Sequence, residues 1–394
     1  MQADPSLPAL TSLVVLGGLL LGALLGALAQ ATRFCTMGAL ADWFTYRDPS
    51  RLLAWLLAVA VAALGAGALV TSGALDAARS IYLAPRLAWL SALAGGAVFG
   101  FGMVLASGCP QRALVRAGAG NLKALVTLLA VAVAAQMTLR GLLALPRTRV
   151  LDPWSVTLAG PQDLPSILSR WGAGAPEALR WTLLALLALA TAGLMWRRRA
   201  ALERSHWIGG LGVGLLVVAA WALTGHFGHL AEHPDTLEAA WLGTQSGRPE
   251  AFSFVGPLAH GLELLTLWTD RSVAASFGVT VALGVALGSA ASALLRREFR
   301  WEAFRSTEDL SNHLIGGMLM GFGGVTALGC SIGQGVSGLS LLSAGALLAV
   351  AGIALGARAA LRWQEWRIER LDAASQSPVP ASCLPNARKQ GSAS

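Results

Sequence analysis

The chain has 394 residues, of which 55% are hydrophobic and only 13% are charged, and its mean hydropathy is +0.60. Soluble domains are about one-quarter charged, so this composition excludes an ordinary soluble protein. The net charge of +8 does not indicate nucleic-acid binding, because the arginines lie in short segments between apolar runs and form no clustered basic patch. Arginines in such segments are typical of signals that orient a protein in a membrane.

The chain contains nine apolar runs of the length needed to cross a bilayer, which takes about 20 residues. They lie at 8–30, 52–71, 88–108, 122–142, 181–196, 207–223, 273–295, 312–329 and 340–361. Lys and Arg favour the cytoplasmic side, and an outside N-terminus places 19 of them in inner segments against 8 in outer segments. The sequence therefore predicts an all-α polytopic membrane protein with its N-terminus outside and its C-terminus inside.

One apolar stretch occurs twice, as GGAVFGFGMVLASGC at 95–109 and as GGMLMGFGGVTALGC at 316–330. Matching residues differ by 221 in number throughout. The two copies cross the membrane in opposite directions, so we predict two inverted repeats, as in many transporters whose sites lie between the repeats. The expected divisions are a first repeat, an extracytoplasmic loop with a connecting helix, a second repeat and a basic, disordered tail, at 1–142, 143–206, 207–361 and 362–394.

Two further segments are apolar but too short to span a bilayer, and we expect each to form a short re-entrant helix. The first is FCTMGALADWFTY at 34–46, and its counterpart in the second half is 252–265. Their alignment places Cys35 opposite Ser253, so the third cysteine breaks the symmetry of the two halves.

Each copy of the repeated stretch ends in a cysteine that is followed by residues that break a helix. Free backbone amides at broken helix ends favour anions, and a thiol adds a weak donor and a polarizable sulfur. We therefore predict a path for a soft, sulfur-containing anion, with no catalytic residue, no metal and no cofactor. The residues expected to line it are Cys35, Cys109, Cys330, Gly108, Gly329, Gln111, Ser331 and Gln334.

Two other functions are open at this point. A membrane thiol oxidoreductase or sulfurtransferase would use the cysteines covalently, although no two of them have the C-x-x-C spacing of a redox pair. A metal-handling protein would use an outer cluster whose helical spacing suits zinc or copper, although a solvated outer segment is the preferred interpretation. That cluster is His226, His229, Glu232 and His233. Carboxylates for a cation pathway are sparse, with Asp42 and Glu263 the candidates.

Three motifs, RFCTMGALAD at 33–42, GFGMVLASGCP at 100–110 and GFGGVTALGCSIGQG at 321–335, together resemble the YeeE/YedE family of bacterial sulfur transporters. The resemblance implies an hourglass-shaped bacterial inner-membrane permease that imports thiosulfate. It places the family's cysteines at Cys35, Cys109 and Cys330, which would pass the anion along by S–H···S hydrogen bonds without covalent capture. A different sulfur or selenium species is an alternative substrate, and a cytoplasmic sulfur-carrier protein is a candidate partner.

Overall fold

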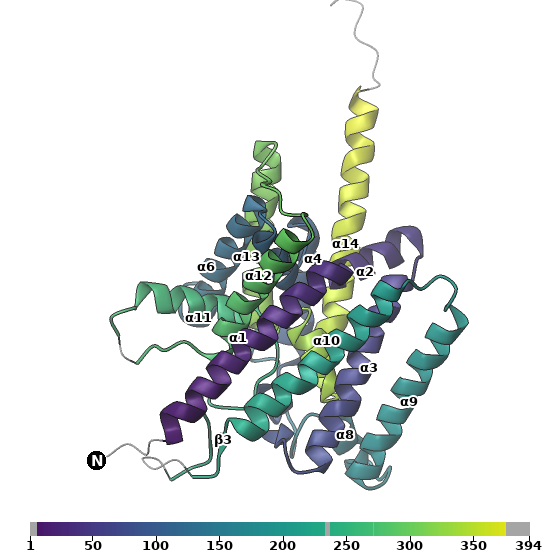
Figure 1. Cartoon of the computed structure of the whole chain (residues 1–394). Coiled ribbons are helices and arrows are strands. Elements are labelled where there is room, and N and C mark those ends of the chain that lie inside the picture. The colour runs from purple at the N-terminus through teal and green to yellow at the C-terminus, as the bar shows by residue number, and fades with distance from the viewer. Residues whose placement is uncertain (1–5, 233–236, 271, 376–394) are drawn as a thin grey trace, which may run out of the picture.

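The computed structural model describes residues 6–232, 237–270 and 272–375, and long helices dominate it (Figure 1). The long helices are α1 (Ser6–Thr32), α3 (Ser50–Thr71), α4 (Trp89–Leu105), α6 (Leu122–Arg140), α9 (Pro176–Arg197), α10 (Arg204–Ala222), α12 (Phe277–Leu295), α13 (Thr307–Thr326) and α14 (Ala344–Ser375). Within these described ranges, β-structure is limited to two small sheets of two strands each.

The predicted class, an all-α polytopic membrane protein, is confirmed. In the described part of the chain, eight helices are long and apolar enough to cross a membrane. The crossing predicted at 312–329 forms α13, which is not among the eight. Its first turn carries Glu308 and Asp309, which lower its hydropathy.

Both predicted short helices are present. The first is α2 (Thr36–Ala41), which continues into the π-helical turn η1 (Asp42–Tyr46). Its counterpart is α11 (Val255–Thr266). Two more short elements follow the repeated stretches, namely α5 (Pro110–Gly118) and the π-helical turn η6 (Gly333–Gly338).

The predicted outer loop at 143–180 is folded and packs against the rest of the chain. Its β2 strand (Val156–Thr157) pairs antiparallel with β1 (Arg86–Leu87). The Ala344 N–H donates to the Gln162 carbonyl oxygen at 3.0 Å, which ties the loop to the start of α14. The other elements of the loop are α7 (Ala144–Pro146), η4 (Arg147–Leu151) and α8 (Leu164–Arg170).

The remaining short elements lie elsewhere in the chain. They are η2 (Ala77–Arg79), η3 (Ile81–Leu83), η5 (Leu223–Phe227), β3 (His229–Leu230) and β4 (Ala240–Trp241).

The two repeated helices, α4 and α13, pack directly against each other with their glycines in contact. A Cβ built on Gly102 would lie 2.6 Å from the Gly316 carbonyl oxygen, and one built on Gly316 would lie 2.7 Å from the Gly102 carbonyl oxygen. Gly95 faces Gly323 in the same way at the other end of the contact. Only glycine allows backbones this close, and the order of these pairs shows that the helices run antiparallel.

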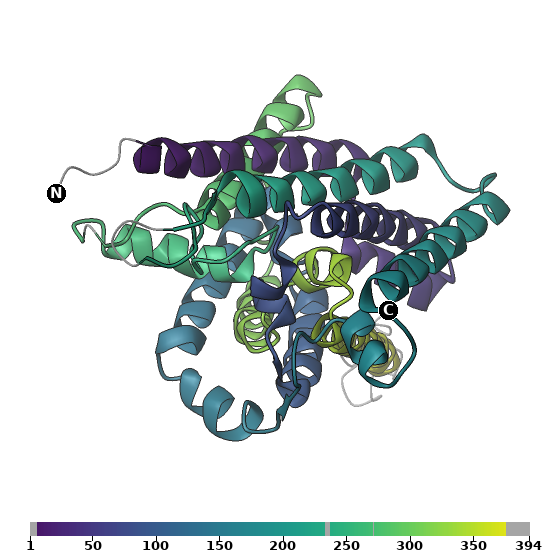
Figure 2. The ribbon, with the colours of Figure 1, turned by 90° about the horizontal axis from the view of Figure 1, so that it is seen from below.

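The remaining long helices form pairs that each combine one helix from either half. The α1 helix packs along α12 and α10 along α3, while α4 packs on α14 and α6 on α13. Seen from the end where α1 begins, α1 and α10 lie across the view, and α13 and α14 are nearly end-on (Figure 2). This interlocked pairing supports the division into repeats at 1–142 and 207–361, which stays a prediction.

The connecting helix and the tail complete the comparison with the sequence. The α9 helix lies at the edge of the bundle, where it contacts α3 and α8 (Figure 1). The α14 helix continues to Ser375, so the prediction of disorder from 362 is wrong for 362–375. The helix continues there because this segment consists of good helix formers such as Arg, Glu and Leu. The rest of the predicted tail, 376–394, lies outside the described residues.

Candidate transport path

The helices α4 and α13 both end a few residues before their cysteine, in the same irregular turn. Ser107 and Leu328 adopt left-handed backbone conformations with φ of 56° and 58°. The N–H groups of Gly108 and Gly329 then donate to the carbonyl five residues earlier, at 2.9 and 2.8 Å, as in a Schellman cap. Non-glycine residues at positive φ are strained, and such strain gathers at functional sites.

The first turn delivers Cys109 into the protein interior. Cys109 is fully buried and is the N-cap residue of α5, and its Sγ lies 4.0 Å from Oε1 of Gln111. The Ser331 hydroxyl, from the other half of the chain, lies beside the same thiol. Within the described part of the chain, neither Gln111 Nε2 nor Ser331 Oγ has a hydrogen-bond partner, although both side chains are 1% exposed. Buried polar groups without a partner are candidates for contacts with a bound group.

The second turn delivers Cys330 in the same way. Cys330 is fully buried, and its Sγ accepts a hydrogen bond from the Gly333 N–H at 3.3 Å. The N–H groups of Ile332 and Phe254 also face this sulfur, so the start of α11 contributes to the site. Gln334 is buried and donates through Nε2 to the Ala327 carbonyl, while its Oε1 has no partner among the described residues.

The third predicted thiol, Cys35, is half-buried and is the N-cap residue of α2. Its Sγ accepts a hydrogen bond from the Gly38 N–H at 3.3 Å. Cys35 and Cys330 both lie near Cys109. The structure therefore brings the three predicted cysteines to one region, with Cys109 near both of the others.

Cys35 also lies on the wall of a cavity of about 640 Å³, which we call the arginine cavity. Ser107, the strained residue at the end of α4, contributes to the same wall. Basic side chains dominate the lining, which includes Arg33, Arg51, Arg112, Arg297 and Arg300.

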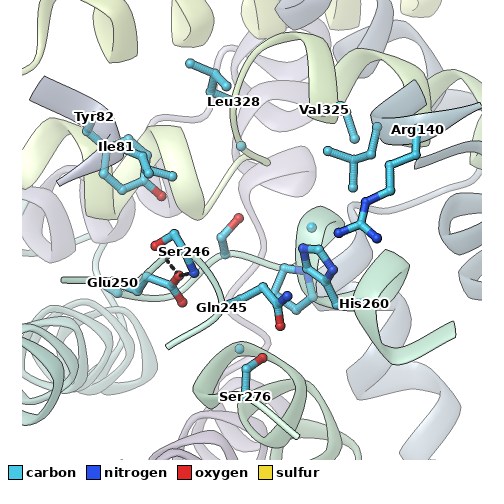
Figure 3. A pocket seen from close by; sticks show the side chains of 18 residues that line it. Ile81, Tyr82, Arg140, Gln245, Ser246, Glu250, His260, Ser276, Val325 and Leu328 are labelled. Carbon is cyan, nitrogen blue, oxygen red and sulfur yellow. Dashed lines mark hydrogen bonds between the residues drawn. The ribbon is translucent and has the colours of Figure 1, made fainter. Parts of the chain in front are cut away.

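A second cavity, of about 300 Å³, reaches Gly329, the residue next to Cys330, and we call it the Glu250 cavity. Arg140 and His260 lie on one side of this cavity and Tyr82 and Glu250 on the other (Figure 3). Cys35 and Gly329, two of the predicted path residues, thus lie on the walls of two different cavities. The buried thiols relate these two positions, because Cys109 lies near Cys35 and Cys330 is next to Gly329.

Tyr82 is a residue of this site that the sequence did not reveal. It is 4% exposed, it packs edge-on against Trp221 at 6.2 Å, and its hydroxyl hydrogen-bonds with Ser253. It also lines a neighbouring cavity of about 260 Å³ that extends to Gln334. Tyr82 lies in the short helix η3, which has no recognisable sequence motif, and its being one of two tyrosines in the chain was the available signal.

Glu250 is the second residue that the sequence did not reveal. Burial raises the pKa of its carboxyl group above the usual value of 4.5, although hydrogen bonds from Ser246 act in the opposite direction. One of these bonds is donated by the Ser246 N–H to Glu250 Oε1 at 2.8 Å (Figure 3). The neutral carboxyl group is therefore favoured to a higher pH than for an exposed glutamate.

The two carboxylates expected of a cation pathway are both paired with cations. Glu263 is buried and contacts the Arg140 guanidinium, and its other oxygen lies 3.2 Å from Nδ1 of His260. Asp42 forms an ion pair with Arg51 at 3.3 Å. Paired carboxylates do not offer a free negative site, so this arrangement gives no support to cation transport.

The outer histidines do not form the helical cluster that their spacing suggested. His226 belongs to η5 and packs against Phe227, whereas His229 starts β3 and packs against Trp241. The π-helical turn ends at Phe227, so the assumed helical spacing is wrong at this point. Among the described residues, no group of three or more His, Cys, Asp or Glu side chains could hold a metal ion. His233 lies outside those residues.

Comparisons with known proteins agree over most of the chain. The sequence profile of the family described as "Sulphur transport" matches residues 31–359. The "Thiosulfate transporter TsuA" of Escherichia coli (strain K12) is 28% identical over 344 residues, which are 82% of this chain and 87% of that protein. The "Thiosulfate transporter TsuA" of Spirochaeta thermophila is 26% identical over 345 residues, 84% of this chain and 93% of that protein.

Proposed function

This chain belongs to the sulphur transport family, and from that premise we propose that it is a bacterial inner-membrane permease that imports thiosulfate. The two relatives named as thiosulfate transporters support the substrate. The observation that carries the proposal is the pair of fully buried thiols, Cys109 and Cys330, at matched breaks of the two repeated helices.

Thiosulfate fits the groups around these thiols. It is a divalent anion with a soft terminal sulfur and three oxygens, so it accepts weak hydrogen bonds from thiols and stronger ones from polar donors. Gln111 Nε2 and Ser331 Oγ are unpartnered donors at Cys109 within the described chain, and the backbone amides at Cys330 are further donors. Several weak contacts suit passage, because a permeating ion must be held and then released.

We place the Glu250 cavity at the periplasmic side and the arginine cavity at the cytoplasmic side. The anion would then meet Cys330 first, Cys109 next and Cys35 last. The N-terminus would be periplasmic and the C-terminus cytoplasmic, because basic segments favour the cytoplasmic face. Gly108 and Gly329 would line the narrow part of the path. A cytoplasmic sulfur-carrier protein that accepts the anion from the arginine-rich side belongs to the same proposal.

The direct test is growth of a bacterial strain that lacks its own sulfate and thiosulfate importers, with thiosulfate as the only sulfur source. Cells that carry this chain should grow, and cells with Cys109→Ala should not. The matched control is Cys383→Ala, which makes the same chemical change in the tail and should leave growth intact. No growth with the unchanged chain, despite its presence in the membrane, would contradict the proposal.

A further inference from the structure

The arginine cavity has a much larger positive charge than passage of a single anion past Cys35 requires. Five arginines line it, and among the described residues the acidic member of the lining is Glu298, which accepts a hydrogen bond from Gln30 Nε2 at 3.1 Å. These arginines come from segments that are distant in the sequence. They are Arg33, Arg51, Arg112, Arg297 and Arg300. The fold therefore gathers positive charge around one space from both halves of the chain.

Few of these charges are neutralised by the protein itself. In the described part of the chain, Arg51 is the member that forms an ion pair, with Asp42. The Arg112 guanidinium has a buried Nη1 with no hydrogen-bond partner among the described residues. Like charges held around one cavity repel each other, and a buried donor without a partner costs about 1–3 kcal/mol. An anion bound in the cavity would reduce the repulsion among the guanidinium groups.

The chemistry of the lining selects the kind of anion. Guanidinium groups are planar donors that bind the oxygens of oxyanions in pairs and carry their charge at all physiological pH values. A compact divalent oxyanion presents several oxygens and twice the charge of chloride, so it gains most from this lining. The Cys35 thiol adds a soft hydrogen-bond donor to the same wall. Its sulfur accepts a hydrogen bond from the Gly38 N–H, and its S–H group is the donor.

We propose that the arginine cavity is a second binding site, separate from the buried thiols, for a divalent oxyanion such as sulfate or thiosulfate. The site itself follows from the lining, and its role in import rests on the proposed function. It binds thiosulfate that leaves Cys35, and it also binds oxyanions already in the cytoplasm. Accumulated anion therefore occupies the exit and slows further import.

The test measures protection of Cys35 in inverted membrane vesicles, which expose the cytoplasmic face. The background carries Cys330→Ala, which interrupts the proposed path, and Cys383→Ser, which removes the thiol of the tail. The readout is the rate at which Cys35 reacts with N-ethylmaleimide, a neutral reagent, followed by mass spectrometry of the labelled peptide. Sulfate at four times its dissociation constant should slow the reaction about fivefold, whereas chloride at equal ionic strength should not.

Two matched variants assign the protection to the cavity wall. Arg112→Gln combined with Arg297→Gln should abolish the protection by sulfate. Arg296→Gln, which removes an exposed arginine outside the lining, should preserve it. Equal protection in the double variant and its parent, equal protection by chloride, or no protection by sulfate and thiosulfate would each overturn the proposal. Protection without any thiosulfate uptake by the unchanged chain would support the site and contradict the permease.

Discussion

The breaks after α4 and α13 have the same backbone but different surroundings. Each has a left-handed residue, a glycine and then a buried cysteine, Cys109 in the first half and Cys330 in the second. Cys109 begins the regular helix α5, whereas Cys330 precedes the π-helical turn η6. The sequence alignment of the two halves also places Cys35 in the first half opposite Ser253 in the second.

This difference separates what the fold requires from what the function requires. The antiparallel contact of α4 with α13 needs matching glycines on both helices, so packing maintains the symmetry of the backbone. No such requirement acts on the groups that face the path. Cys35 lies on the wall of the arginine cavity, and Gly329, next to Cys330, lies on the wall of the Glu250 cavity. The path that we propose therefore has two different ends within a symmetric framework.

The largest expected effect comes from a change that breaks the symmetric contact itself. Gly102→Val would place a side chain where a Cβ alone lies 2.6 Å from the Gly316 carbonyl oxygen. Overpacking of this kind costs about 1–3 kcal/mol or more, so we expect loss of the monodisperse protein in detergent. The control is Gly193→Ala in α9, where nothing lies within 4 Å of the added Cβ. This control should keep or slightly raise the melting temperature, and an equal loss in both variants would contradict the packing account.

A smaller effect is expected where the two halves differ in a thiol. Cys35→Ala removes one weak donor worth ~1 kcal/mol, so the initial rate of thiosulfate uptake into proteoliposomes should fall about fivefold. Ser253→Cys, which restores the symmetry, should change the rate much less because a hydroxyl donor is already present. If Ser253→Cys impaired uptake more than Cys35→Ala, the proposed role of the asymmetry would be wrong.

The last effect, no larger than that of Cys35→Ala, concerns the charge of Glu250 at the other end of the proposed path. Because its pKa is raised, Glu250 becomes negative only as the pH rises above the usual range, and it then repels an anion. Uptake by the unchanged protein should fall about fivefold across this transition, which corresponds to ~1 kcal/mol of repulsion. Glu250→Gln should remove the fall. The free energy of unfolding should also fall as the pH rises. A carboxyl group whose pKa is raised in the folded state destabilises the fold when it ionises.

Arg140, His260 and Glu263 also face this end of the path, so a second variant is needed for the assignment. His260→Gln should keep the fall in uptake that Glu250 causes. A fall that persists in Glu250→Gln but disappears in His260→Gln would assign the titration to the histidine instead.

The features that repeat in the sequence could be predicted, because repetition is visible without coordinates. The 221-residue offset predicted that α4 and α13 are equivalent helices, and the short apolar segments that align Cys35 with Ser253 predicted the short helices α2 and α11. The common path of Cys35, Cys109 and Cys330 came from the resemblance to a family. The helix ends were less accurate, because Ser107 and Leu328 adopt the left-handed conformation that glycine usually adopts at the end of a helix.

The parts of the site that occur once could not be predicted. Tyr82 comes from the short helix η3 and Glu250 from a loop, and only the folded chain brings them into one cavity with Gly329. The arginines of the arginine cavity were interpreted as orientation signals, since a count of charges per segment cannot show that separate segments surround one space. The helical interpretation of the histidine spacing was wrong for a different reason. It assumed a regular helix in a segment where the chain turns.

We propose that the thiols carry the anion by hydrogen bonding and not by covalent capture. The most direct measurement is uptake of radiolabelled thiosulfate into proteoliposomes by the unchanged protein, Cys330→Ser and Cys330→Ala. A hydroxyl can still donate a hydrogen bond but does not form a persulfide, so we predict that Cys330→Ser keeps a measurable part of the uptake and Cys330→Ala keeps none. Equal loss in both variants, together with a persulfide on Cys330 of the unchanged protein by mass spectrometry, would contradict the account and favour covalent thiol chemistry.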